Sequence, residues 1–283
     1  MAPSTGTLPP HEAAQAVLRT GLTHLAEPLV VTFTQNLYGA MCLSSGGLFS
    51  ILVRAGFAGF ASENNPGIQR LLQGFAFPFG IVLTYTIGAE LFTGYPMWLT
   101  MAALERKGRP HQYIYGVVTS WVGNLLGALL FSALFTYSTQ AISEDPWRSA
   151  IVTQITEDIV DLSWHIIFLR AFGCGWLVTI AMFLGTQNQD GISKAVCLHF
   201  PFMISATARF PHTVEYMYLA STGMMLGAPL SVGGFFWKCL LPITLGNIIG
   251  GGLFTGAYLW WTHICGQKRE YEGADGNLLD DHE

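Results

Sequence analysis

The sequence is short of charged residues. Asp, Glu, Lys and Arg make up 11% of its 283 residues, whereas hydrophobic residues make up 51%. A soluble globular domain carries about a quarter charged residues, so this deficit excludes an ordinary soluble protein. The formal net charge is −5, and nothing in the sequence indicates a nucleic-acid partner.

Closely paired cysteines are also absent. The five cysteines lie in or beside apolar segments without CxxC spacing, which is most simply explained by packing in helices. We therefore expect no metal ion, no cofactor and no catalytic residue. Residues 1–27 lack the basic start and apolar run of a cleavable signal peptide. These cysteines are Cys42, Cys174, Cys197, Cys239 and Cys265.

Long apolar runs take the place of the missing charges. A helix needs about 20 residues to cross the hydrocarbon core, and six runs are long enough: 28–60, 66–104, 112–138, 163–187, 195–228 and 235–265. They predict an all-α polytopic membrane protein whose transmembrane domain spans 28–265. Residues 1–27 predict a segment with an amphipathic interfacial helix, and residues 266–283 an acidic, disordered tail.

The charges that remain predict an orientation. Arg106, Lys107 and Arg109 follow the second span, whereas the connection after the third span holds five acids against the single Arg148. Loops rich in Lys and Arg face the cytoplasm. We expect both termini in the cytoplasm and the protein in the plasma membrane.

Two stretches indicate an internal repeat. "VGNLLGALLFSA" (122–133) and "LGNIIGGGLFTGA" (245–257) place Asn124 and Asn247 in the last span of each three-span half. Small residues and a buried amide are typical of close helix packing with a hydrogen bond across it. Because each half has an odd number of spans, the second copy is inverted. Transporters with inverted halves bind substrate where helices are broken.

The second span of each half carries the residues that break a helix. Span two contains "TIGAELFTGYP" (86–96) and span five contains "FPHTVE" (210–215), and both runs are too long for one straight crossing. We predict two half-helices in each, broken near 86–95 and 207–213. Backbone groups freed there must face a cavity or other protein groups.

Together these features resemble the formate/nitrite transporter family over essentially the whole chain. The resemblance rests on the order of an amphipathic N-terminal helix, "NLYGAMCLSSGGLFS", "GAELFTG", "GNLLG", "GCGWLV", the span-five histidine and "GNIIGG". It indicates a divergent eukaryotic member. It implies an aquaporin-like fold of six spans with two broken helices, assembled as a homopentamer in the lipid bilayer. It also implies passage of protons and small monovalent anions or weak acids, such as formate, nitrite, acetate, lactate or hydrosulfide.

The resemblance assigns roles along one path in each protomer. His212 corresponds to the central histidine, and Thr93 to the threonine on the facing break. Leu91 and Ile81 correspond to the apolar constriction toward the cytoplasm and Phe77 to the outer one, with Phe92 beside the path. Asn124, Asn247 and Glu90 are expected to hold the half-helices in place.

Several positions depart from the family pattern. Gly175 and Tyr216 stand where asparagine is usual, Glu215 where alanine is, and Pro211 where an acid is common. Ile159 occupies the place of a basic residue near the outer end of span four. Its neighbours Glu157, Asp158 and Asp161 are acidic, so we expect the outer vestibule to repel anions.

A histidine between apolar constrictions predicts a mechanism. An anion pays several kcal/mol to enter an apolar constriction, and a neutral acid passes more cheaply. His212, with an ordinary pKa of about 6.5, is suited to donate a proton or a hydrogen bond. Glu215 and Tyr216 are candidate modulators of His212. Glu215 pairs either with His212, three residues away, or with Arg209 or a neighbouring helix. We expect Arg209 to donate to freed carbonyls, with the vestibule as its alternative.

Other interpretations stay open from the residues alone. His212 can be a structural histidine that satisfies loop carbonyls. The acidic vestibule also suits an aquaporin-like channel for a neutral solute or weak base. A membrane haem protein needs facing histidines, and those available are His165, His199, His212 and His263, none at i, i+4 spacing.

Overall fold

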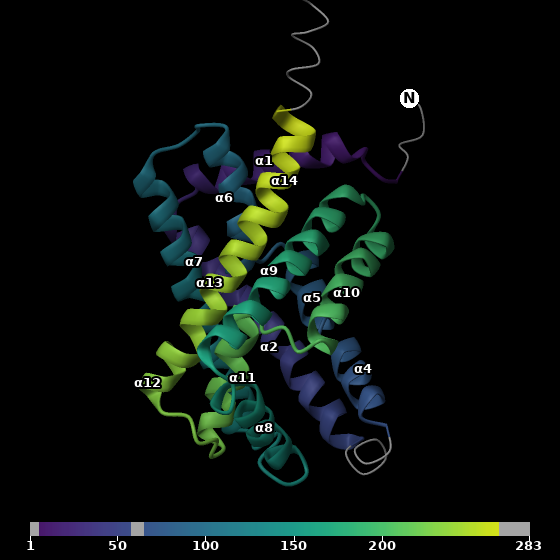
Figure 1. Cartoon of the computed structure of the whole chain (residues 1–283), viewed down its shortest axis with the longest axis vertical. Helices are drawn as coiled ribbons and strands as arrows, with labels where there is room; N and C mark the ends of the chain where they lie inside the picture. Colours follow the sequence, from purple (N-terminus) through teal and green to yellow (C-terminus); the bar gives the residue numbers. More distant parts are fainter. Residues whose placement is uncertain (1–5, 58–64, 266–283) are drawn as a thin grey trace, which may run out of the picture.

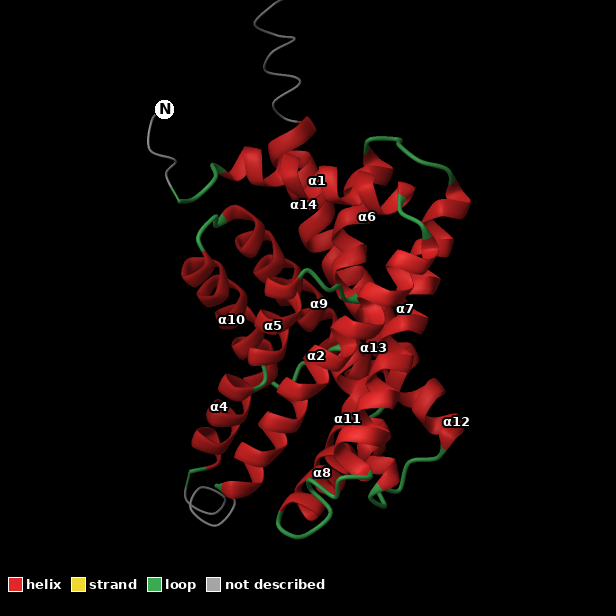
Figure 2. Ribbon diagram, turned by 180° about the vertical axis from the view of Figure 1, so that it is seen from behind, coloured by secondary structure: helices red, strands yellow, loops and turns green. Residues whose placement is uncertain are grey.

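The computed structural model describes residues 6–57 and 65–265 as one bundle of helices (Figure 1). Within those ranges every regular element is a helix (Figure 2), and the sole β-bridge joins Thr7 to Asn188. The acidic tail predicted over 266–283 lies outside the described residues.

The helices follow one another with short connections. In chain order they are α1 (Pro10–Ala26), α2 (Leu29–Gly56), α4 (Pro66–Ala76), α5 (Phe79–Ile87), η1 (Phe92–Gly94), α6 (Tyr95–Leu104), α7 (Pro110–Phe131), η2 (Ser132–Tyr137), α8 (Trp147–Ile155), η3 (Thr156–Val160), α9 (Trp164–Gln187), α10 (Gly191–Thr207), α11 (Thr213–Met225), α12 (Val232–Gly234), η4 (Phe235–Leu240), α13 (Leu241–Ile249), η5 (Gly250–Ala257), α14 (Tyr258–Trp260) and η6 (Trp261–Cys265).

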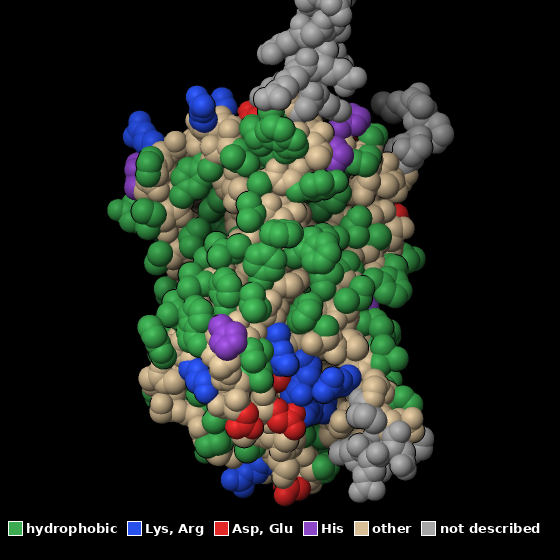
Figure 3. Space-filling view, viewed as in Figure 1, with side chains coloured by type: hydrophobic (Ala, Val, Ile, Leu, Met, Phe, Trp, Pro, Cys, Tyr) green, Lys and Arg blue, Asp and Glu red, His purple; other side chains and the backbone are tan. Residues whose placement is uncertain are grey.

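The bundle has the surface of an integral membrane protein. Five helices are continuous, long and apolar enough to cross a bilayer: Leu29–Gly56, Gly67–Ile87, Pro110–Tyr137, Trp164–Gln187 and Val232–Cys265. The predicted fifth span is present as α10 and α11, each too short to cross alone. Apolar side chains cover the middle of the molecule, and most charged side chains lie toward its two ends (Figure 3).

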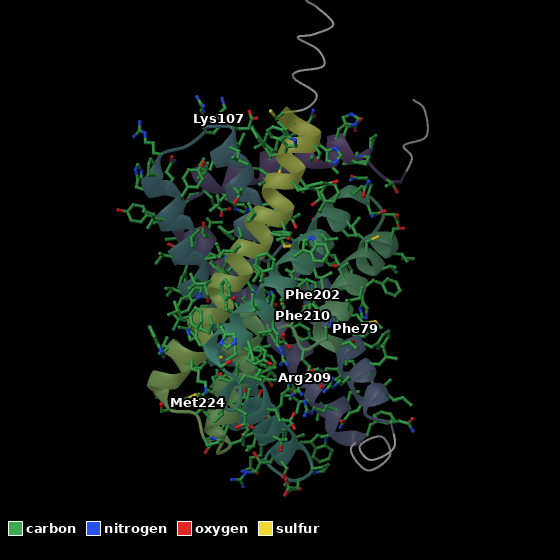
Figure 4. All side chains as sticks on the ribbon, viewed as in Figure 1. Phe79, Lys107, Phe202, Arg209, Phe210 and Met224 are labelled. Carbon is green, nitrogen blue, oxygen red and sulfur yellow. The ribbon has the colours of Figure 1, made fainter. Side chains whose placement is uncertain are left out.

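Helix α1 lies across one end of the bundle, which we call the α1 side; α8 marks the opposite, α8 side (Figures 1 and 2). Its buried residues Ala13, Val17, Gly21 and His24 recur at helical spacing, so one face packs on the bundle. Lys107 also lies on the α1 side (Figure 4), as does η6, the last described helix, which contacts α1. This is the arrangement that the predicted orientation requires, although the side that faces the cytoplasm stays a prediction.

The connection after the third span is more ordered than the sequence indicated. We treated it as an acidic loop, but most of residues 147–160 are helical, as α8 and η3. Ile151, Ile155 and Ile159 are buried at four-residue spacing. One helical face therefore packs on the core and includes the buried Asp158, while Glu157 lies on an exposed face.

The two halves repeat the same packing, as the inverted repeat predicts. Helix α7 crosses α2 so closely that a Cβ added at Gly123 would lie 2.8 Å from the carbonyl oxygen of Phe33. Helix α13 crosses α9 in the same way, and a Cβ at Gly246 would lie 2.6 Å from the carbonyl oxygen of Phe168. Only glycine permits these crossings, which explains the small residues shared by the two repeat stretches.

Both predicted helix breaks are confirmed. Helix α5 ends at Gly88, whose φ of 77° is left-handed and favours glycine, and residues 89–91 are unwound before η1. Helix α10 ends at Thr207, and the chain turns through Arg209, with φ of 57°, before α11 begins at Thr213.

Asn124 satisfies the backbone at the first break. Its Oδ1 accepts a hydrogen bond from the Phe92 amide at 2.7 Å. Its Nδ2 donates to the carbonyl of Asn36 at 2.5 Å and, more weakly, to that of Glu90 at 3.4 Å. One buried side chain thus links α7, α2 and the unwound segment.

Asn247 does the same at the second break. Its Oδ1 accepts from the Thr213 amide at 2.8 Å, and its Nδ2 donates to the carbonyls of Ala171 at 2.7 Å and Pro211 at 3.2 Å. We call these two asparagines, Asn124 and Asn247, the break asparagines.

We expect Asn247→Ala to destabilise the protein strongly. It leaves the buried amide of Thr213 and the carbonyl of Pro211 without this partner, each costing about 1–3 kcal/mol. The midpoint of thermal unfolding in detergent should fall by many degrees relative to Gln189→Ala, a change at an exposed amide. Equal midpoints for the two variants would show that Asn247 does not hold the break.

Candidate functional site

The centre of the molecule holds one pair of polar side chains from the two breaks. Thr93 Oγ1 lies 2.8 Å from His212 Nε2, and both residues are about 1% exposed. Thr93 belongs to η1, and His212 caps the start of α11. The structure therefore brings together the two residues that the sequence predicted at the centre of the path.

The surroundings of His212 assign its tautomer. Its Nδ1 accepts a hydrogen bond from the Glu215 amide at 3.2 Å. A backbone N–H can only donate, so Nδ1 carries no proton and the ring proton sits on Nε2. Nε2–H then donates to Thr93 Oγ1, which leaves the threonine O–H free to donate elsewhere.

Two half-helices begin beside this pair. Helix α6 starts directly after η1, and α11 starts directly after His212. The N-terminal end of a helix carries partial positive charge and free N–H groups, which favour a nearby anion. The pair of Thr93 and His212 is thus uncharged, and the two helix N-termini give its surroundings a partial positive potential.

A cavity of about 180 Å³ opens beside the pair toward the α1 side. Leu91 and Ile81, the predicted constriction residues, line it and are themselves about 1% exposed. Glu90 and Trp98 line the same cavity. An apolar wall therefore separates this cavity from His212.

A narrower cavity of about 20 Å³, room for about one water, lies toward the α8 side. Phe77 lines it, as the predicted outer constriction residue should. The Phe77 ring also packs 6.3 Å from that of Phe202, which lies 5.6 Å from the His212 ring. Phe202 was not singled out from the sequence, where one more phenylalanine in an apolar run carries no signal.

Phe92 lies elsewhere. It lines a third cavity, an apolar lateral groove of about 490 Å³ between α7 and the η4–α13 segment, with Trp121 and Trp237. The backbone amide of Phe92 donates to Asn124 at the first break.

Charges on the α8 side are paired. Arg209 Nη2 lies 2.7 Å from Asp158 Oδ1 and 2.8 Å from Glu157 Oε2, and Arg54 lies 3.7 Å from the same Glu157 oxygen. Burial favours the neutral acid, but the hydrogen bond and charge of Arg209, with Arg54, outweigh it and lower the pKa of Glu157. Arg209 thus pairs with Glu157 and Asp158 in place of the expected freed carbonyls, and its charge offsets that of these two acids.

Departures from the family pattern meet in this cluster. The Tyr216 hydroxyl donates to Asp158 Oδ2 at 2.8 Å, and Arg209, Asp158, Glu215 and Tyr216 all line the narrow cavity (Figure 4 labels Arg209). Ile159, at the position of the usual basic residue, is buried. Arg209 therefore brings positive charge to this cavity from another element.

The two remaining departures differ in what the structure explains. His212 caps α11 by accepting from the backbone amide of Glu215, which any residue could supply, and the Glu215 carboxylate lines the narrow cavity and forms no ion pair with any described side chain. At Gly175 a Cβ would lie 2.6 Å from the Asn247 Cα, so the close crossing of α9 and α13 leaves no space for asparagine.

Comparisons with known proteins agree with this geometry. The family model for formate/nitrite transporters matches residues 11–261. A probable formate transporter of Methanothermobacter thermautotrophicus is 31% identical, over 85% of this chain and 90% of its own length. A formate-nitrite transporter of Entamoeba histolytica is 29% identical, over 92% and 72%. A solved pentameric formate channel with formate bound superposes with a TM-score of 0.72 at 22% identity, over 83% of this chain and 98% of that one.

The paired charges of the α8 side lead to a test. Arg209→Gln leaves Asp158 buried without its partner, and breaking such a pair costs about 3–5 kcal/mol. We expect a large fall in the midpoint of thermal unfolding, partly restored in Arg209→Gln with Asp158→Asn. Arg54→Gln, next to the more exposed Glu157, should change the midpoint little. No restoration in the double variant would contradict the pairing.

Proposed function

Because the chain belongs to the formate/nitrite transporter family, shown by the match over residues 11–261, we propose that it carries small monovalent anions as their weak acids, with formate the first substrate to test. It is a membrane transporter and not an enzyme. Nitrite and short monocarboxylates such as acetate and lactate are the alternatives to compare with formate.

The observation that supports this proposal best is the buried pair of Thr93 and His212. In the part of the chain that the structure describes, it is the polar pair that joins the two breaks at mid-molecule. A cavity lies on either side of it, and two helix N-termini flank it. The pair offers hydrogen bonds to the oxygen atoms of the substrate and carries no fixed charge that would trap it.

The hydrogen bonds around His212 favour donation over proton release. The Glu215 amide donates to Nδ1, Nε2–H donates to Thr93, and the threonine hydroxyl is left to donate to substrate. Placing a second proton on the ring would cost the bond to the Glu215 amide. We propose that His212 stays neutral and orients Thr93, while the proton that neutralises the substrate comes from water in the adjoining cavities.

The apolar walls explain why the substrate must be neutral. Leu91 and Ile81 separate the centre from the α1-side cavity, and Phe77 with Phe202 covers it on the α8 side. Desolvating an anion between such side chains costs several kcal/mol even after relaxation. The neutral acid avoids that cost, so one proton accompanies each anion.

We also propose that the protein works as a homopentamer in the plasma membrane with one path per protomer. The solved formate channel that superposes on this chain is pentameric. The lateral surface here carries exposed apolar side chains, including Trp237 and Phe254, that suit lipid or a second copy.

The central variants should lose transport without losing assembly. In proteoliposomes we expect Thr93→Val to reduce formate uptake about fivefold, the effect of one neutral hydrogen bond of about 1 kcal/mol, and Thr93→Ser to retain most of it. His212→Phe should reduce uptake more, because it removes both the cap of α11 and the donor to Thr93. His212→Asn should keep part of the flux.

Uptake is measured with labelled formate, nitrite, acetate and lactate at two pH values, with methylamine for the weak-base alternative. The control is His165→Phe, a change at an exposed histidine. Equal, equally pH-dependent uptake in His212→Phe and in His165→Phe would reject the central pair. Transport of methylamine alone would reject the substrate class.

A further inference from the structure

A second polar cluster lies where α1 meets the first break. His24 and Glu27 of α1 face Glu90 of the unwound segment. His24 Nε2 lies 3.3 Å from Glu90 Oε1, and His24 Nδ1 lies 3.5 Å from Glu27 Oε2. One nitrogen and one oxygen of each carboxylate lie within 4.8 Å of one another. Among the described residues it is the group of three or more His, Cys, Asp or Glu close enough to hold a metal ion.

The imidazole of His24 is buried and lacks a hydrogen bond. The residue is 7% exposed, and its ring stacks on Trp98 with centroids 4.7 Å apart. Neither ring nitrogen has a hydrogen-bond partner, although a carboxylate lies near each. A buried polar atom without a partner costs about 1–3 kcal/mol. The His24 ring therefore lies in the cluster without forming a hydrogen bond to either carboxylate.

Both carboxylates are held by hydroxyl groups. The Tyr95 hydroxyl donates to Glu90 Oε2 at 2.8 Å and leaves Oε1 facing His24. Thr32 Oγ1 donates to Glu27 Oε2 at 2.8 Å, the same oxygen that lies near His24. Outer hydrogen bonds of this kind orient the ligands of metal sites.

We propose that His24, Glu27 and Glu90 bind a divalent transition-metal ion, for which Zn²⁺ is the best match. One imidazole and two carboxylates are ligands that Zn²⁺ accepts, whereas Mg²⁺ and Ca²⁺ prefer oxygen alone. With bonds of about 2.0–2.2 Å, tetrahedral donors lie about 3.3–3.5 Å apart. The two short contacts use different nitrogens of the His24 ring, and a single ion can bind only one of them. One nitrogen and one oxygen of each carboxylate lie within 4.8 Å of one another, so the side chains must move closer together to reach this geometry.

Glu90 connects the cluster to the α1-side cavity, which gives an ion a route in and a water molecule a place as fourth ligand. A bound ion would fasten α1 to the break that carries Leu91.

Binding is tested on the full chain purified in detergent without chelators. Isothermal titration should find one Zn²⁺ per protomer, and Zn²⁺ should raise the midpoint of thermal unfolding while Mg²⁺ at the same concentration does not. Co²⁺ in its place should give the visible bands of tetrahedral nitrogen and oxygen ligation. His24→Asn and Glu27→Gln should each weaken binding more than about tenfold.

His11→Asn is the matched control, because His11 also lies on α1 beside a glutamate, Glu12, but is exposed and lacks a third ligand. It should bind Zn²⁺ as the unchanged protein does. Absence of Zn²⁺ binding, unchanged affinity in His24→Asn, or loss of affinity in His11→Asn would each overturn the proposal. So would a strong thiolate charge-transfer band with Co²⁺, which would place the metal on cysteine.

Discussion

The structure depends on how it satisfies unwound backbone inside a membrane. Hydrocarbon offers no hydrogen bonds, so each break in a span exposes amides and carbonyls that must find partners within the protein. Asn124 and Asn247 supply them, each holding one amide and neighbouring carbonyls in the same pattern. The glycines at the α2–α7 and α9–α13 crossings let these asparagines reach the breaks.

The hydrogen bonds of the break asparagines also determine where the central side chains lie. Because each break asparagine fixes the start of a half-helix, Thr93 and His212 meet at 2.8 Å from opposite halves of the chain. Their donors and the two helix N-termini then face a common point. We propose that selectivity arises from the apolar walls around that point, because on the α8 side the charge of Arg209 is balanced by Asp158 and Glu157.

Most of the framework could be predicted from local signals. The spans follow from apolar length, the breaks from Gly88 and Pro211, and the inverted repeat from the two Gly-Asn stretches. The features that could not be predicted depend on contacts between segments far apart in the sequence. The partners of Arg209 come from η3, about fifty residues away, and His24 meets Glu90 only because α1 folds across the bundle. No pattern in the sequence indicates that Phe92 lines the lateral groove.

The central claim is that substrate crosses the apolar walls as a neutral acid while His212 stays neutral. Its most direct test is the charge moved per formate in proteoliposomes under a potassium–valinomycin potential, with internal pH recorded. Passage of the neutral acid predicts uptake that is independent of voltage and accompanied by one proton per formate. Uptake that scales with voltage and leaves internal pH unchanged would contradict it, because the bare anion would then be crossing the walls formed by Leu91, Ile81 and Phe77.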